Sequence, residues 1–433
     1  MRIFATTLIL LVGFFGKAQE LLTPEDAIKI AVENNFDIRI AKNEFRIDET
    51  NRTIGNAGML PSVLASVTDN NSVQSSSQTR NDGTTQELDN ARNSNLNYGV
   101  ALDWTVFDGL GMFARYDQLK QIENQGKAEL QLMVMTRVSD VLTAYYDLVQ
   151  QKQNLNALDT TLVISRQRVD LAQNRYTIGK SSKLEVLNAQ VDLNTDQTNL
   201  LRAKEMYANS KIVLNQIMAR DTKIDFIVVD EIAVDSALLL PELETLASKQ
   251  NPAIQVQIIN QKIAEFNLRA VKANRYPVVS VSTGYNFVET RNSLGFTTQT
   301  SSNGWAYGFA ATMNVFNGLN QNRNEKVAKL QIETTKLQLA QQSQAVIASL
   351  GQAYQTYLTN IGLIDLESKN EEIAKENLYI TMEKYRIGTI PTIEYRTAQL
   401  NFVNAHLRFS VAKYNAKVSE ITLRELAGNL VLN

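Results

Sequence analysis

The sequence predicts a mainly α-helical protein whose few β-strands cross a membrane. Three observations support this prediction. The 433-residue chain contains only 6 prolines, so long elements can run without interruption. Two pairs of alternating segments have the length of membrane barrel strands. The same order of segments occurs twice, which indicates a duplicated unit.

Composition excludes several classes of function. The chain has no cysteine and a single histidine, His406, which rules out disulfides, thiolate nucleophiles and cysteine-bound metals. A net charge of −2 without a basic cluster argues against nucleic-acid binding. Residues 109–111 lack the lysine and the further glycines of a phosphate-binding loop. We therefore expect no enzyme, no cofactor, no metal site and no nucleic-acid partner.

Residues 1–18 have the pattern of a secretory signal peptide. Arg2 supplies the positive charge, residues 3–15 are mainly apolar, and Gly16 and Ala18 are the small residues that precede a cleavage site. The apolar run is shorter than the ~20 residues of a membrane-spanning helix. No later segment is apolar enough to span a membrane as a helix. We expect an exported protein that begins at Gln19.

Several short motifs recur 209 positions later in the chain. The pairs are residues 98–99 and 307–308 (Tyr-Gly), 106–109 and 315–318 (Val-Phe-Asp-Gly and Val-Phe-Asn-Gly), and 176–179 and 385–388 (Tyr-x-x-Gly). This spacing predicts a first repeat over residues 19–220, a linking segment over 221–240 and a second repeat over 241–433.

Each repeat is predicted to contain a helix, two strands, a long helix, a turn and a second helix. In the first repeat we expect the strand pair at about 61–107, the long helix at 110–176 and the second helix at 183–220. In the second repeat the corresponding ranges are 277–316, 318–385 and 391–428. Polar loops are expected within the strand pairs at roughly 72–94 and 289–303, and a small strand or linker at 222–234.

The predicted strands alternate between apolar and small or polar residues. Aromatic residues near their ends could form the interfacial girdles of a membrane barrel. The candidates are Tyr98, Trp104, Tyr285, Trp305 and Tyr307. An ordinary sandwich with one buried face is the alternative, but four strands so far apart in sequence favour the barrel. Four strands cannot satisfy their own edges in lipid, so copies of the chain must share a barrel, and twelve strands need three chains.

The long helices have a narrow apolar face. After Gly111, residues 112–176 contain no proline and one glycine, Gly126, and would extend for about 100 Å at ~1.5 Å per residue. Apolar residues fall at heptad spacings, while Gln, Asn, Asp, Lys and Thr fill the other positions. This pattern favours a ring of helices around water, an α-barrel, with a plain soluble coiled coil as the alternative. Gly179 and Gly388 can adopt the left-handed conformation that ends a helix.

These features resemble the TolC-like family of outer-membrane efflux proteins, the outer-membrane components of tripartite efflux and secretion systems. The resemblance rests on the two strand-to-helix turns and the two Tyr-x-x-Gly turns, in fixed order and at one spacing. It implies a homotrimer with a 12-stranded barrel among outer-membrane lipid and a helical tunnel in the periplasm. It also implies passive conduction of substrates from a periplasmic adaptor protein and an inner-membrane transporter. An exported structural or adhesive coiled coil with a soluble β head is the alternative function.

The resemblance also implies roles for residues near the turns between the helices. A periplasmic gate would contain Tyr385, Glu185, Glu394, Arg386 and Thr397, and the tips that contact the adaptor would contain Tyr176, Ile178, Gly179, Ile387 and Gly388. Ile390 stands where the family's lock has an arginine, so Arg386 or Lys180 would have to replace it. A simpler interpretation of Glu185 and Glu394 is that they are solvated carboxylates at helix starts.

Overall fold

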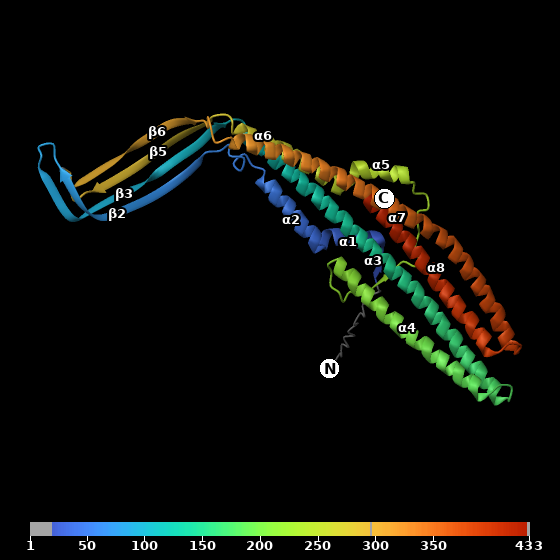
Figure 1. The fold of residues 1–433 in the computed structure, drawn as a ribbon. Coiled ribbons are helices and arrows are strands. Elements are labelled where there is room, and N and C mark those ends of the chain that lie inside the picture. Colours follow the sequence, from blue (N-terminus) through green and yellow to red (C-terminus); the bar gives the residue numbers. More distant parts are fainter. Residues whose placement is uncertain (1–19, 295–296, 431–433) are drawn as a thin grey trace, which may run out of the picture. The chain divides into compact units, whose positions relative to one another are not determined.

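The computed structural model describes residues 20–294 and 297–430 (Figure 1). The predicted signal peptide, residues 1–18, lies outside the described residues. In the described part of the chain the helices are α1 (Pro24–Asn34), α2 (Phe36–Asn51), α3 (Gly111–Thr177), α4 (Lys183–Ile217), α5 (Leu240–Gln250), α6 (Pro252–Ala273), α7 (Asn320–Ile387) and α8 (Thr392–Ala427). The strands are β1 (Glu20–Leu22), β2 (Ser62–Thr79), β3 (Thr85–Asp108), β4 (Phe226–Val228), β5 (Val278–Arg291) and β6 (Gln299–Thr312).

The chain divides into two compact units. Among the described residues, the helical unit comprises 20–42, 130–252 and 343–430, and the strand unit comprises 43–129, 253–294 and 297–342. The helical unit therefore contains α1, α4, α5, α8 and the C-terminal parts of α3 and α7. The strand unit contains the four-stranded sheet and the N-terminal parts of α3 and α7.

The strand unit is built on an antiparallel sheet in the order β2-β3-β5-β6. The predicted polar loop at 72–94 is wrong, because β2 and β3 stay paired as far as Thr79 and Thr85. Asp82 and Gly83 form the connecting turn, where Gly83 has a φ of 85° and the Asp82 carboxylate accepts from the Thr84 N–H at 3.0 Å. Polar side chains lie on both faces of this part of the hairpin, so the sequence shows no alternation of apolar and polar residues there.

The second strand pair also differs from the prediction. β5 continues to Arg291 and β6 begins at Gln299, so the expected loop at 289–303 is shorter. β6 ends at Thr312, which leaves Val315 and Phe316 beyond the strand. Because β3 pairs with β5 only from Ser94 onward, the β2–β3 hairpin extends past the rest of the sheet. The edges of the sheet are β2 and β6, and every residue of β6 is exposed in the single chain.

Repeated turns connect the strands to the long helices. Gly109 and Leu110 have φ values of 71° and 68°, and Gly318 and Leu319 have values of 67° and 63°. A side-chain oxygen of Asp108 accepts from the N–H of Met112 at 3.0 Å, and the same atom of Asn317 accepts from the N–H of Gln321 at 3.2 Å. These bonds satisfy free N–H groups in the first turn of α3 and α7, which explains why Asp or Asn precedes each glycine.

Two helices stand where one was predicted before each strand pair. The breaks fall at Asn35 and Asn251, which lie between α1 and α2 and between α5 and α6. The Asn35 amide donates to the Ile217 carbonyl at 2.7 Å, and the Asn251 amide donates to the Leu426 carbonyl at 2.9 Å. Each asparagine thus donates to a carbonyl at the C-terminal end of a helix distant in sequence, α4 or α8. The apolar pattern of one helix does not reveal such a contact with another helix.

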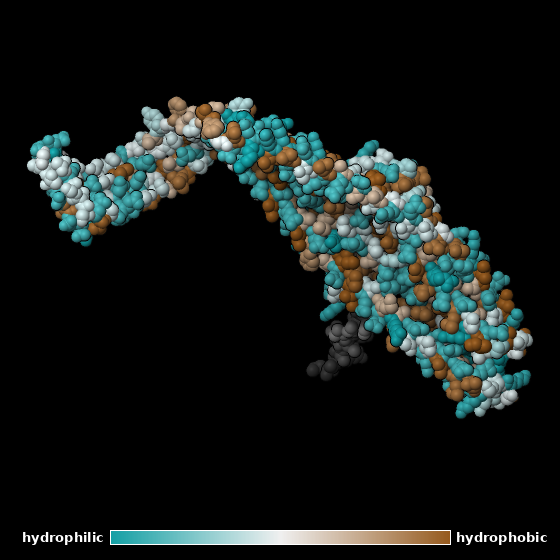
Figure 2. Space-filling model, in the orientation of Figure 1, coloured by the Kyte–Doolittle hydropathy of each residue, from teal (hydrophilic) through white to brown (hydrophobic). Residues whose placement is uncertain are grey.

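The hydrophobic core of the helical unit lies around the parallel pair of strands β1 and β4. Tyr145 of α3 is fully buried there and its hydroxyl donates to the Leu22 carbonyl at 2.7 Å. In the visible face of the surface, apolar and hydrophilic residues are interspersed over the helices (Figure 2), as narrow apolar stripes predict. None of the helices within the described ranges has a stretch long and apolar enough to cross a membrane.

Candidate functional site

The candidate site lies in the helical unit, near the turns that join α3 to α4 and α7 to α8. Gly179 and Gly388 end α3 and α7 with φ values of 75° and 88°. The Lys180 N–H donates to the Arg175 carbonyl at 2.8 Å, and the Thr389 N–H donates to the Lys384 carbonyl at 3.1 Å. Both turns therefore satisfy helix-end carbonyls through a left-handed glycine, as the sequence predicted.

Tyr385 and Glu185, two of the predicted gate residues, lie in contact. The Tyr385 hydroxyl donates to the Glu185 carboxylate at 3.0 Å, and only 1% of Tyr385 is exposed. Its ring stacks on Tyr395 of α8 with 5.1 Å between centroids and an angle of 7° between the planes. Burial raises the pKa of Tyr385, and the nearby Glu185 carboxylate raises it further, so the phenol remains a neutral donor at neutral pH. This contact joins α7 to the first turn of α4.

The cation beside this contact is Arg175, which the sequence analysis missed. Its guanidinium lies 4.6 Å from the centre of the Tyr385 ring, 3.8 Å from the Glu185 carboxylate, and donates to the Tyr385 carbonyl. Arg386 instead is exposed and pairs with Glu383 at 3.3 Å, one turn away on its own helix. The position of Arg175 in the sequence could have identified it. Arg175 directly precedes the first Tyr-x-x-Gly turn, and another cation, Lys384, stands at the equivalent place before the second.

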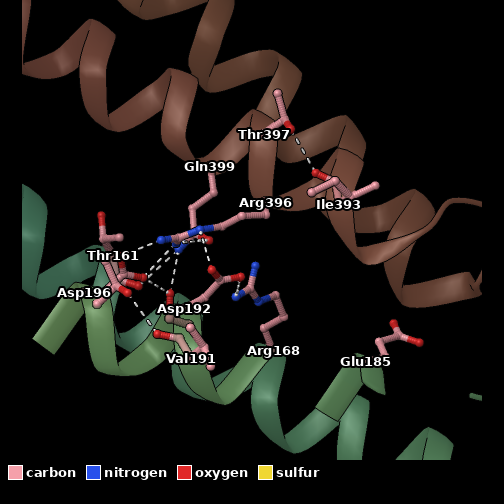
Figure 3. Close-up of polar contacts among 12 residues, drawn as sticks. Thr161, Arg168, Glu185, Val191, Asp192, Asp196, Ile393, Arg396, Thr397 and Gln399 are labelled. Carbon is pink, nitrogen blue, oxygen red and sulfur yellow. Dashed lines mark hydrogen bonds and ion pairs between the residues drawn. The ribbon is translucent and has the colours of Figure 1, made fainter. Parts of the chain in front are cut away.

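The other two predicted gate residues lie on the exposed side of α8. Glu394 is exposed in the first helical turn, where the simpler interpretation placed it. Thr397 is also exposed and its hydroxyl donates to the Ile393 carbonyl at 2.9 Å. Figure 3 shows Thr397 on the side of α8 that is turned away from Arg396. Neither residue joins the Tyr385 contact in the single chain.

A buried polar cluster joins α3, α4 and α8, and no sequence argument identified it. Its members are Thr161, Ser165, Arg168, Asp192, Asp196, Arg396 and Gln399 (Figure 3). Arg396 makes two bonds of 2.8 Å to the Asp196 carboxylate, and Arg168 makes one bond of 2.5 Å to Asp192. Two arginines thus balance two aspartates at a place where Arg168, Arg396 and Asp196 are buried and Asp192 is partly exposed. The sequence could have indicated this cluster in one way. Its polar residues are spaced three or four positions apart, like the apolar heptad residues of the same helices.

The predicted tip residues surround the two glycines and are exposed. Ile178 is 65% exposed and Ile387 is 71% exposed. Tyr176 is 43% exposed, whereas its counterpart Tyr385 in the second repeat is buried. The same motif therefore has two roles in one chain: a surface tyrosine in the first repeat and a cross-linking tyrosine in the second.

The predicted girdle residues lie on the sheet of the strand unit. Tyr98 stacks on Phe287 at 4.9 Å, and Tyr285 meets Trp305 edge to face at 5.4 Å, in both cases across paired strands. Tyr307 is 87% exposed. The Trp104 indole donates to the Met59 carbonyl at 2.9 Å, beside the β2 end of the sheet, so it lies apart from the other aromatic residues. Trp305 and Tyr307 are thus exposed in the single chain, and their girdle role stays a prediction.

A family model described as "Outer membrane efflux protein" matches residues 27–220 and 243–429. The chain belongs to this family. The match confirms the resemblance inferred from the repeated motifs. Efflux transport at the outer membrane is the function shared by this family, whose members are channels rather than enzymes.

Individual outer-membrane proteins are also similar to this chain. The chain is 20% identical over 315 residues to the outer membrane protein TolC of Vibrio cholerae, an alignment that covers 72% of this chain and 71% of the relative. It is 20% identical over 310 residues to TolC of Escherichia coli, covering 68% of this chain and 62% of that protein.

Solved structures share the fold. The Campylobacter jejuni CmeC outer membrane channel has a TM-score of 0.77 at 16% identity, with 94% of this chain and 86% of that chain covered. The Vibrio cholerae outer membrane protein VceC has a TM-score of 0.74 at 14% identity, with coverages of 94% and 96%. This chain therefore shares the fold of these solved outer-membrane proteins.

Proposed function

We propose that three copies of this chain form the outer-membrane exit duct of a tripartite efflux or secretion system. The observation that carries the proposal is the four-stranded sheet, whose edge strands β2 and β6 have a neighbour on one side only within the described residues. Open edges are not tolerated in hydrocarbon, so neighbouring copies must supply the missing partners. Three copies give a closed 12-stranded barrel, while α3, α4, α7 and α8 of each copy surround a tunnel in the periplasm.

The contact among Tyr385, Glu185 and Arg175 would hold this duct closed at its periplasmic end. It ties the end of α7 to α3 and α4, so the helix tips cannot separate while the Tyr385 hydroxyl bond and the Arg175 contacts persist. A hydrogen bond to a charged group contributes about 1.5–3 kcal/mol. Its loss would raise the ratio of open to closed ducts by about tenfold or more.

Single-channel conductance in planar bilayers tests the gate. Tyr385→Phe removes the hydroxyl and keeps the stacked ring, so we expect more frequent or longer openings than in the unaltered protein. Tyr176→Phe is the matched control, because the equivalent tyrosine of the first repeat is exposed and should leave conductance unchanged. Equal openings in the Tyr385→Phe variant and the control would refute the gate.

In the assembled duct Glu394 would face the lumen and form a ring of carboxylates. Its exposure in the single chain supports this placement, since no neighbouring helix covers it. Three carboxylates around a narrow passage favour cations. Glu394→Gln should then reduce the cation selectivity measured from the reversal potential in a salt gradient. An unchanged reversal potential would argue for the simpler role of a solvated helix-start carboxylate.

The exposed tips would contact the periplasmic adaptor, which receives substrate from an inner-membrane transporter. Ile178 and Ile387 support this proposal, because large apolar side chains at the ends of solvated helices are typical of interaction surfaces. Photo-crosslinkers at residues 177–183 and 386–391 should capture an adaptor in cells that express it. Capture from positions along the middle of α4 instead would place the contact elsewhere.

A further inference from the structure

A pocket of about 220 Å³ lies between α3 and the ends of α7 and α8, beside the buried polar cluster. Its lining comprises Gln167, Arg168, Leu171, Met382, Glu383, Tyr385, Arg386 and Tyr395. This volume is below the ~300 Å³ at which pockets for drug-sized ligands begin, so a ligand would be about one ring in size. The proposed duct assigns no role to this pocket.

Arg168 is the unusual member of the lining. Its side chain is fully buried, yet it makes a single hydrogen bond of 2.5 Å, through one terminal nitrogen, to Asp192. The atoms Nε and Nη1 are buried and have no hydrogen-bond partner among the described residues. Figure 3 shows one terminal nitrogen of Arg168 directed at Asp192 and the other directed away from it. Buried donors without acceptors are costly, and a charged guanidinium more than most.

The guanidinium of Arg168 is paired with Asp192, and the other charges near the pocket leave its Nε and Nη1 donors without an acceptor. Arg396 is engaged by Asp196 through two bonds, so it does not compete for a ligand. Glu383 and Arg386 pair with each other and together add no net charge. Burial raises the pKa of Tyr395 to about 12, so its phenol is neutral and does not repel an anion.

The rest of the lining is apolar or aromatic. Leu171 and Met382 contribute aliphatic surface, and the stacked rings of Tyr385 and Tyr395 contribute a flat face. A strongly hydrated inorganic anion would gain nothing from these side chains, whereas an anion with an apolar body would. Carboxylate is the group that a guanidinium recognises well through its N–H donors.

We propose that this pocket binds a small amphipathic carboxylate, with the carboxylate at Arg168 and an aromatic or aliphatic body against Leu171, Met382 and the two tyrosines. The inference goes beyond the proposed duct and does not depend on it, because binding can be measured whether or not the protein conducts. It concerns an anion held between the helices, not the cations that a ring of carboxylates would favour in the lumen.

Benzoate is the probe, titrated by isothermal calorimetry into the full-length protein in detergent, with empty micelles as the blank. We expect saturable binding of benzoate, at least tenfold weaker binding of the uncharged analogue benzamide, and no binding of inorganic phosphate. Arg168→Gln should weaken benzoate binding at least tenfold. The matched control is Arg166→Gln, an exposed arginine two residues away on the same helix, which should bind benzoate as the unaltered protein does.

Met382→Phe provides a second variant, since it narrows the pocket and leaves Arg168 in place. It should also weaken benzoate binding at least tenfold, and circular dichroism would establish that both variants keep their helices. Equal binding of benzoate and benzamide, phosphate binding without benzoate binding, or benzoate binding unaffected by both Arg168→Gln and Met382→Phe would each overturn the proposal. An absence of saturable benzoate binding to the unaltered protein would overturn it as well.

Discussion

Arg168, Arg396 and Asp196 lie buried among α3, α4 and α8, away from the water that such charges prefer, and Asp192 lies beside them with 32% of its side chain exposed. Arg396 and Asp196 form a bidentate pair in which less than a tenth of either side chain is exposed. Ser165 and Gln399 complete their hydrogen bonds. A buried pair of this kind contributes little net stability, but the loss of one partner is expensive because the other remains charged and buried. The cluster therefore fixes which helix faces meet.

Removing one partner of the buried pair should be strongly destabilising. We expect Arg396→Gln to lower the free energy of unfolding by about 3–5 kcal/mol, because Asp196 would remain as an uncompensated buried charge. Arg408→Gln is the matched control: Arg408 is 53% exposed, pairs with Glu367 at 3.0 Å, and should cost about 0–1 kcal/mol. Thermal or chemical unfolding in detergent, followed by circular dichroism, measures the difference. Equal losses in the two variants would contradict the role of burial.

Buried tyrosines predict a loss of stability in alkali. Burial raises the pKa of Tyr395, Tyr145 and Tyr146 to about 12, above the ordinary value of 10. Between pH 10 and 12 the unfolded chain loses these protons while the folded chain keeps them, so the free energy of unfolding falls as pH rises. Absorbance of tyrosinate and helical circular dichroism across this range measure both effects. Tyr395→Phe should reduce the slope, and titration of all three tyrosines near pH 10 would contradict the prediction.

At the scale of elements, the repeated turns were the most predictable features. Glycines at 179 and 388 and the Asp-Gly and Asn-Gly turns at 108–109 and 317–318 carry their conformational reason in the residue type. The helix breaks at Asn35 and Asn251 were not predictable, because their cause is a carbonyl at the end of a helix distant in sequence. A hydrogen bond between residues far apart in the chain does not produce a periodic pattern in the sequence.

The effect of replacing glycine by alanine should differ between Gly388, in the turn after α7, and Gly362, inside α7. Gly388→Ala places a methyl group at a φ of 88°, with its Cβ 3.3 Å from the Arg175 guanidinium, and should cost about 1–2 kcal/mol of stability. Gly362→Ala lies in the helix interior with open space around the new Cβ and should add up to about 1 kcal/mol. Unfolding midpoints of the two variants give the comparison. A stabilised Gly388→Ala variant would show that the turn does not need its left-handed residue.

The predictable part of the candidate site was the pair Tyr385 and Glu185, and the unpredictable part was its surroundings. The family resemblance placed the tyrosine and the carboxylate by motif, and the structure brings them to 3.0 Å. Arg175, Arg168 and Arg396 depend instead on which faces of α3, α4, α7 and α8 meet. A heptad pattern indicates that helices pack but does not specify the partner of each polar position. The lengths of β2 and β3 were predicted too short for a related reason. The paired residues between Ser94 and the turn are mainly polar, so this part of the hairpin has no apolar face.

At the scale of the whole molecule, the exposed face of β6 requires an environment that one chain in water does not supply. Trp305, Tyr307 and Phe309 are 72%, 87% and 80% exposed and lie on one side of the strand. Patches of this size and aromatic content are typical of membrane or subunit contacts.

Serine in place of Trp305, Tyr307 and Phe309 should abolish stable insertion in the outer membrane. The variant would lose the apolar surface that favours lipid, while helical circular dichroism of the purified protein should persist because the helical unit is unaltered. Ala306→Ser with Ala310→Ser is the matched control on the opposite side of the strand. Fractionation of membranes and the particle mass in detergent measure the outcome. Normal insertion of the triple variant would place the lipid contact on another surface.

The two hairpins of the sheet differ in length, and this difference would determine the symmetry of the outer opening of a three-copy barrel. The β2–β3 hairpin continues past Ser94 to its turn at residues 80–84, whereas β5 and β6 stop at Arg291 and Gln299. In a three-copy assembly the outer rim would therefore alternate between tall and low hairpins. In that assembly, a phage, toxin or antibody that approaches from outside would encounter three equivalent tall hairpins.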